Sequence, residues 1–141
     1  MVSAGVKNAL QAVEDWGKGT VFLDIGPTGK LLRPLGELDF EDAVSTFAEM
    51  VRAGAAAGAE AVLIETMSDI YEAKAALLAA KENSDLPVFV TMTFDEDGKL
   101  LTEGSLPWLP PCWRAWVRMR LALIAAWVPS RWPACCQSCG S

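Results

Sequence analysis

The sequence predicts an α/β fold built around a parallel sheet, and three observations lead to this expectation. Short apolar runs of strand length alternate along the chain with single helical patterns. The runs are apolar on both faces, which is typical of strands that helices cover. Clusters of Gly, Pro and Asp close the runs as turns. Strands of this kind, separated by single helices, predict βαβ crossovers in the order α-β-α-β-α-β.

The first helix is expected from Val6 to Glu14, where the pattern of apolar residues is weakly amphipathic. Gly17 and Gly19 end this helix. The apolar run TVFLDIG that follows is the first predicted strand, and the segment GPTG closes it as a loop.

The second helix is expected to begin after Asp39, whose side chain is a plausible N-cap, and to continue to about Ala53. Its apolar positions recur at helical spacing: Phe40, Val44, Phe47 and Val51. A turn at Gly58 then leads to the second predicted strand, AVLIET, from Ala61 to Thr66.

The third helix is expected from Ile70 to Glu82, with Ser68 or Asp69 as its cap. Glu72 and Lys74 on this helix are interpreted as a solvated or interhelix charge pair. The run LPVFVTMTF, Leu86 to Phe94, is the third predicted strand, and DEDGK at 95–99 is a turn.

Two architectures contain this alternation, the doubly wound open sheet and the closed (β/α)₈ barrel. GPTG lacks the spacing of the dinucleotide-binding fingerprint, so the doubly wound open sheet is weakly supported. In a barrel the functional groups lie at the carboxyl ends of the strands. Polar residues do end each predicted strand here: Asp24, then Glu65 and Thr66, then Thr91 and Thr93, of which the last two are also ordinary strand formers.

Composition narrows the possible functions. A net charge of −6 and a pI near 4.6 argue against a nucleic-acid partner. The absence of histidine removes the commonest general base and metal ligand. The N-terminal stretch lacks the apolar core of a secretory signal, so a cytoplasmic location is expected. The longest apolar run, Leu121 to Val128, is far shorter than the roughly 20 residues of a membrane span, so none is expected.

The motifs DIGPTG, then ETMSD followed by KAA, then TMTFD resemble, in order and spacing, the homocysteine S-methyltransferase family. The similarity is to the homocysteine-binding domain found in cobalamin-dependent methionine synthase, and it covers roughly Val6 to Ser105. The resemblance implies a (β/α)₈ barrel, of which the three strands would be about the third to the fifth. Residues 1–105 are therefore interpreted as part of such a barrel domain.

The resemblance also implies a chemistry. In the family, three cysteines hold a zinc ion that binds homocysteine as a thiolate, and zinc lowers the pKa of the thiol. In the cobalamin-dependent enzyme the methyl group comes from methylcobalamin on another module. Glu65 matches the carboxylate that holds the substrate amino group, and Asp24, Thr66 and the backbone of residues 26–29 are expected around the same substrate.

The departures from the family pattern predict an inactive chain. The first two barrel strands would precede Met1, and the similarity is expected to stop after Ser105, before the strands that carry the zinc cysteines. By matching motif, no zinc ligand is present. The open strand edges of a partial barrel predict self-association, or completion by the missing barrel segments.

Residues 106–141 have a different composition from the rest. All 18 acidic residues lie at or before Glu103, whereas five of six Trp and all four Cys follow it. One alternative is a small noncatalytic zinc-binding or interaction module that uses the cysteines Cys112, Cys135, Cys136 and Cys139. Another is a tail that contacts membrane surfaces through arginines interleaved with tryptophans.

We predict instead that this tail is translated out of frame and has no defined fold. Plausible GC-rich codons from Trp108 onward, read one nucleotide earlier, give AAALLEGLGADALGLNCSLGP, the continuation expected of the family. Resequencing the coding DNA from the codon of Asp95 past the stop codon should therefore reveal the sixth barrel strand in a shifted frame. A reading with no such frame would show that the Trp and Cys tail is genuine protein.

Overall fold

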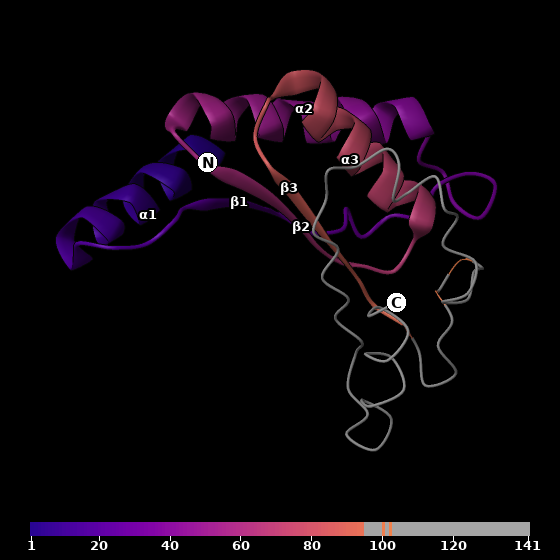
Figure 1. The fold of residues 1–141 in the computed structure, drawn as a ribbon. Helices are drawn as coiled ribbons and strands as arrows, with labels where there is room; N and C mark the ends of the chain where they lie inside the picture. The colour runs from indigo at the N-terminus through magenta and orange to yellow at the C-terminus, as the bar shows by residue number, and fades with distance from the viewer. Residues whose placement is uncertain (95–99, 101, 103–141) are drawn as a thin grey trace, which may run out of the picture.

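The computed structural model describes residues 1–94, 100 and 102. Within these residues helices and strands alternate as predicted (Figure 1). The elements are α1 (Val2–Trp16), β1 (Phe22–Ile25), α2 (Phe40–Ala57), β2 (Ala61–Met67), α3 (Ile70–Asn83) and β3 (Val88–Met92). The predicted turn at 95–99 and the tail with its four cysteines lie outside the described residues.

The three strands form one parallel sheet in the order β1-β2-β3, which confirms the α/β class. Register is set by pairs such as Ile25 with Ile64, and Ile64 with Val90. Because paired residues of parallel strands point to the same face, these three side chains lie together, and all are fully buried. They form the face on which the helices pack.

The opposite face of the sheet is also largely apolar, but it is open among the described residues. The rings of Phe22 and Phe89 lie there with centroids 5.4 Å apart, and Phe22 is 40% exposed. Asp24 also belongs to this face, because it alternates with the buried Leu23 and Ile25. The expectation that both faces are covered is therefore met on one face only, within residues 1–94.

Helices α2 and α3 lie on the same side of the sheet and pack against each other (Figure 1). A Cβ atom on Gly54 of α2 would come within 2.7 Å of the Leu23 side chain, so glycine permits the close approach of helix to strand. The face of α3 that packs inward consists mainly of alanines with no exposed surface: Ala73, Ala75, Ala76, Ala79 and Ala80.

The predicted boundary residues flank the helices: Gly17 ends α1, Asp39 and Gly58 flank α2, and Asp69 precedes α3. Gly58 ends α2 in the left-handed conformation, with φ of 102°. Asp69 caps α3, because its Oδ1 accepts a hydrogen bond from the Tyr71 N–H at 2.7 Å. Asp39 precedes α2 but makes no capping hydrogen bond, and its carboxylate instead pairs with Arg33 at 3.1 Å.

The first helix begins at Val2, four residues before the predicted start. Its Ser3 hydroxyl donates to the Ala53 carbonyl of α2 at 3.2 Å, and Val6 of the same helix is buried. None of the described helices combines the length and the hydropathy that crossing a bilayer requires.

Candidate functional site

The carboxyl ends of the three parallel strands meet at one edge of the sheet, and the predicted site residues lie there. Asp24 is exposed near the end of β1, where it pairs in register with Leu63. Glu65 follows Leu63 by two residues on β2 and is half-buried, so strand alternation places both carboxylates on the open face. Thr66, the next residue, is exposed.

The sheet is irregular at this position. Ile64 pairs with Val90, but the next pair is Met67 with Met92. Two residues of β2, Glu65 and Thr66, therefore lie opposite Thr91 alone, which is the arrangement of a β-bulge. Bulges of this kind redirect side chains and are frequent beside active sites.

The bulge places Thr66 in an unusual backbone conformation. Its φ is +53°, in the left-handed region that a β-branched residue rarely adopts. Such a conformation costs on the order of 1–3 kcal/mol and persists only where surrounding contacts enforce it.

Thr91 provides one of these contacts. Its hydroxyl oxygen accepts a hydrogen bond from the Thr66 N–H at 2.9 Å, and the Thr91 residue is only 2% exposed. Regular pairing resumes immediately afterwards, because the Thr93 N–H donates to the Met67 carbonyl at 2.8 Å.

The loop after β1 is attached to the beginning of α3. Oε1 of Glu72 accepts one hydrogen bond from the Thr28 N–H at 2.7 Å and another from the Thr28 hydroxyl at 2.6 Å. Glu72 lies in the first turn of α3, where the helix dipole favours a negative charge. These bonds bring the GPTG segment next to the residues that follow β2.

This arrangement corrects the interpretation of Glu72. The sequence predicted a solvated or interhelix charge pair with Lys74, but Glu72 is buried at 3% exposure, whereas Lys74 is exposed. The periodicity did contain a signal, because position 72 shares a helix face with the buried alanines 75, 76 and 79. A carboxylate on a buried face requires a hydrogen-bonding partner, and Thr28 supplies it.

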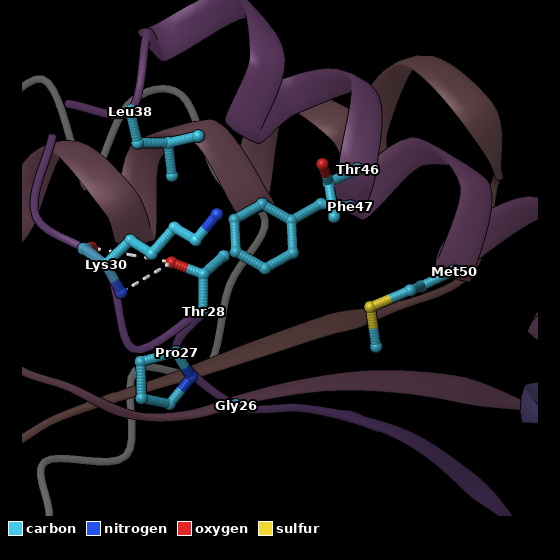
Figure 2. A pocket seen from close by; sticks show the side chains of 8 residues that line it. All are labelled: Gly26, Pro27, Thr28, Lys30, Leu38, Thr46, Phe47 and Met50. Atoms are coloured by element: carbon cyan, nitrogen blue, oxygen red, sulfur yellow. Dashed lines mark hydrogen bonds between the residues drawn. The ribbon is translucent and has the colours of Figure 1, made fainter.

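The same loop borders a cavity of about 460 Å³ between itself and α2 (Figure 2). In Figure 2 the Lys30 side chain extends toward the Phe47 ring, with Leu38 above it and Thr28 below it. The lining residues are Gly26, Pro27, Thr28, Lys30, Leu38, Thr46, Phe47 and Met50. The predicted loop residues Gly26, Pro27 and Thr28 line this cavity, whereas Asp24, Glu65 and Thr66 do not.

The described residues do not fit the zinc site that the family resemblance implies. Residues 1–94, 100 and 102 include neither Cys nor His, and among them no three potential ligands lie close enough together to hold a metal ion. The tail cysteines, and with them the alternative zinc module, lie outside the described part of the chain, as does the basic tail proposed to contact membranes.

The two carboxylates at the carboxyl edge of the sheet suit a cationic ligand group. The carboxylates of Asp24 and Glu65 make no hydrogen bond or ion pair with any other described residue. A carboxylate that is half-buried and unpaired can form strong, charge-assisted hydrogen bonds with an ammonium or guanidinium donor. Glu65 has this combination, and its place at the bulge fixes its backbone.

The family model described as homocysteine S-methyltransferase matches residues 1–120 of the chain. The matched region thus contains all three strands and continues past Ser105, where the resemblance was expected to stop. A search of the curated proteins finds no match.

Replacing Glu72 should destabilise the protein more than replacing another glutamate of the same helix. We expect Glu72→Ala to lower the free energy of unfolding by roughly 2–4 kcal/mol, because it leaves two donors of Thr28 without their acceptor. The measurement is urea unfolding followed by circular dichroism. Glu82→Ala, at an exposed position of α3, is the matched control and should change stability by no more than about 0.5 kcal/mol. Equal effects of the two substitutions would contradict the proposed role of Glu72.

Proposed function

This chain belongs to the homocysteine S-methyltransferase family, and on that premise we propose that it binds the amino-acid portion of homocysteine at the carboxyl edge of its sheet. The observation that supports this most directly is the Glu65 carboxylate, which is half-buried at the bulge and has no partner among the described residues. An α-ammonium group carries three N–H donors and a positive charge, so it matches such a carboxylate.

We propose supporting roles for two neighbours of Glu65. Asp24 lies on the same face of the sheet and adds a second negative charge near the bound ammonium. Thr66 is exposed, and its hydroxyl can donate a hydrogen bond to the carboxylate of the amino acid. The loop at residues 26–29, attached to α3 through Glu72, borders this region.

We also propose that the three strands are part of a (β/α)₈ barrel of the methionine synthase type. Their order in the sheet is sequential and both crossover helices lie on one face, as a barrel requires. A doubly wound sheet changes direction and places helices on both faces. β1 has no strand on its outer side among the described residues, so we expect this edge to pair with further barrel strands or with another copy.

Binding and catalysis are expected to be separable in these 141 residues. The family's methyl transfer needs a thiolate activated by zinc, and neither the matching motifs nor the described residues provide the three cysteines. We therefore propose that this chain by itself binds homocysteine without methylating it, and that the cobalamin cofactor belongs to another module.

The amino-group interaction can be tested by comparing two thiols. Isothermal titration of the full chain should show tighter binding of L-homocysteine than of 4-mercaptobutyrate, which lacks the amino group. Glu65→Gln should reduce the affinity for L-homocysteine roughly ten- to a hundredfold, because it removes the negative charge that pairs with the ammonium and leaves only a neutral acceptor. The affinity for 4-mercaptobutyrate should not change.

Glu82→Gln is the matched control, since it makes the same chemical change at an exposed position far along α3. It should leave both affinities at the wild-type values. If Glu65→Gln keeps the wild-type preference for the amino acid, then Glu65 does not hold the ammonium group.

The absence of catalysis can be tested independently. The full chain, incubated with methylcobalamin, L-homocysteine and added zinc, should form no more methionine than a protein-free reaction. Mass spectrometry of the product is the measurement. Methionine formed above that background, in proportion to the protein concentration, would overturn the proposal of an inactive chain.

A further inference from the structure

The hydroxyl of Thr91 stands in the position of a backbone acceptor. In a regular parallel ladder the N–H groups of β2 would donate to carbonyls of a neighbouring strand. The bulge leaves two residues of β2 opposite one residue of β3 and so disrupts this pattern. The Thr66 N–H donates to the Thr91 side chain at 2.9 Å instead.

We propose that Thr91 is a positioning residue, whose buried hydroxyl holds the bulge so that the Glu65 carboxylate is directed at the ammonium group of the bound amino acid. This inference rests on the proposed function and adds to it a residue that does not itself contact the ligand. Thr91 would otherwise be an ordinary strand residue.

The argument begins with the peptide group that Thr91 contacts. The Thr66 N–H belongs to the peptide that joins Glu65 to Thr66. A hydrogen bond to this N–H therefore fixes the plane of that peptide, and with it the backbone torsion ψ of Glu65. The Glu65 Cα is thereby held at a set distance from β3.

The second step concerns the conformation of Thr66. Its φ of +53° is unfavourable for a β-branched side chain, and without an external restraint the residue would relax to an extended conformation. Such a relaxation would rotate the same peptide and move Glu65. The Thr91 hydroxyl opposes this relaxation directly.

The third step is that Thr91 is well suited to act as a restraint. It is 2% exposed, and its neighbours Val90 and Met92 are fully buried in the core. A threonine side chain has few accessible rotamers, so its oxygen occupies a fixed position. Because the Thr91 side chain is buried, water competes little for its hydrogen bond to Thr66.

The test uses three variants of the full chain, two at Thr91 and one at Thr93. Thr91→Val has nearly the same shape but lacks the acceptor, whereas Thr91→Ser retains a hydroxyl. Thr93→Val makes the same chemical change two residues further on, where the hydroxyl makes no hydrogen bond to another described residue. Two quantities are measured: hydrogen exchange of the Thr66 amide by NMR, and the affinities for L-homocysteine and 4-mercaptobutyrate.

In Thr91→Val we expect the Thr66 amide to exchange about tenfold faster and the L-homocysteine affinity to fall about tenfold, as for the loss of one hydrogen bond. The affinity for 4-mercaptobutyrate should stay constant. Thr91→Ser should restore both properties, and Thr93→Val should behave as the wild type. Wild-type exchange at Thr66 in a folded Thr91→Val variant would overturn the inference.

The binding data separate this inference from the proposed function. If Glu65→Gln abolishes the preference for the amino acid but Thr91→Val does not, only the positioning role of Thr91 is overturned. If Glu65→Gln has no effect, both the ammonium role of Glu65 and the positioning inference are overturned.

A further variant covers the case in which Thr91→Val does not fold. Thr91→Ala also removes the acceptor hydroxyl, and it puts no methyl group in the place of that hydroxyl. It should show the faster Thr66 amide exchange and the lower L-homocysteine affinity that are expected for Thr91→Val. Wild-type exchange and affinity in Thr91→Ala would overturn the inference.

Discussion

The pair of hydrogen bonds between Glu72 and Thr28 is the interaction on which the arrangement of the candidate site depends. A carboxylate at 3% exposure is costly to bury, and two short bonds together with the N-terminus of α3 offset that cost. The bonds join the loop after β1 to the helix after β2. The motifs DIGPTG and ETMSD are thereby brought to one edge of the sheet, although 44 residues separate the bonded groups in sequence.

The sheet and the site impose different requirements on the same strands. In the core, β2 follows a regular alternation with fully buried residues such as Val62 and Ile64, and α2 approaches closely at Gly54. At its carboxyl end β2 departs from that regularity, and the departure lies at Glu65 and Thr66. The stable core thus supports a local strain that the site residues could not maintain alone.

Much of the fold could be predicted because its signals are local. The spacing of Phe40 and Phe47 and the run AVLIET identify a helix and a strand without reference to the rest of the chain. The position of Glu65 at the carboxyl edge of the sheet could be predicted in the same way, because Glu65 lies at the end of that run. Asp39 does occupy the predicted N-cap position of α2, but its carboxylate pairs with Arg33 and makes no capping hydrogen bond. The role of Glu72 and the left-handed Thr66 were missed because each depends on a partner distant in sequence, Thr28 or Thr91.

The long sequence separation between Thr28 and Glu72 has a consequence for the order of events during synthesis. A ribosome adds about 5–20 residues per second, so roughly 2–9 seconds pass between the addition of these two residues. During that time the loop after β1 has no access to its acceptor on α3, while α2 can already form from local contacts. The loop is therefore expected to become ordered late, only after the chain has been extended through the first turn of α3.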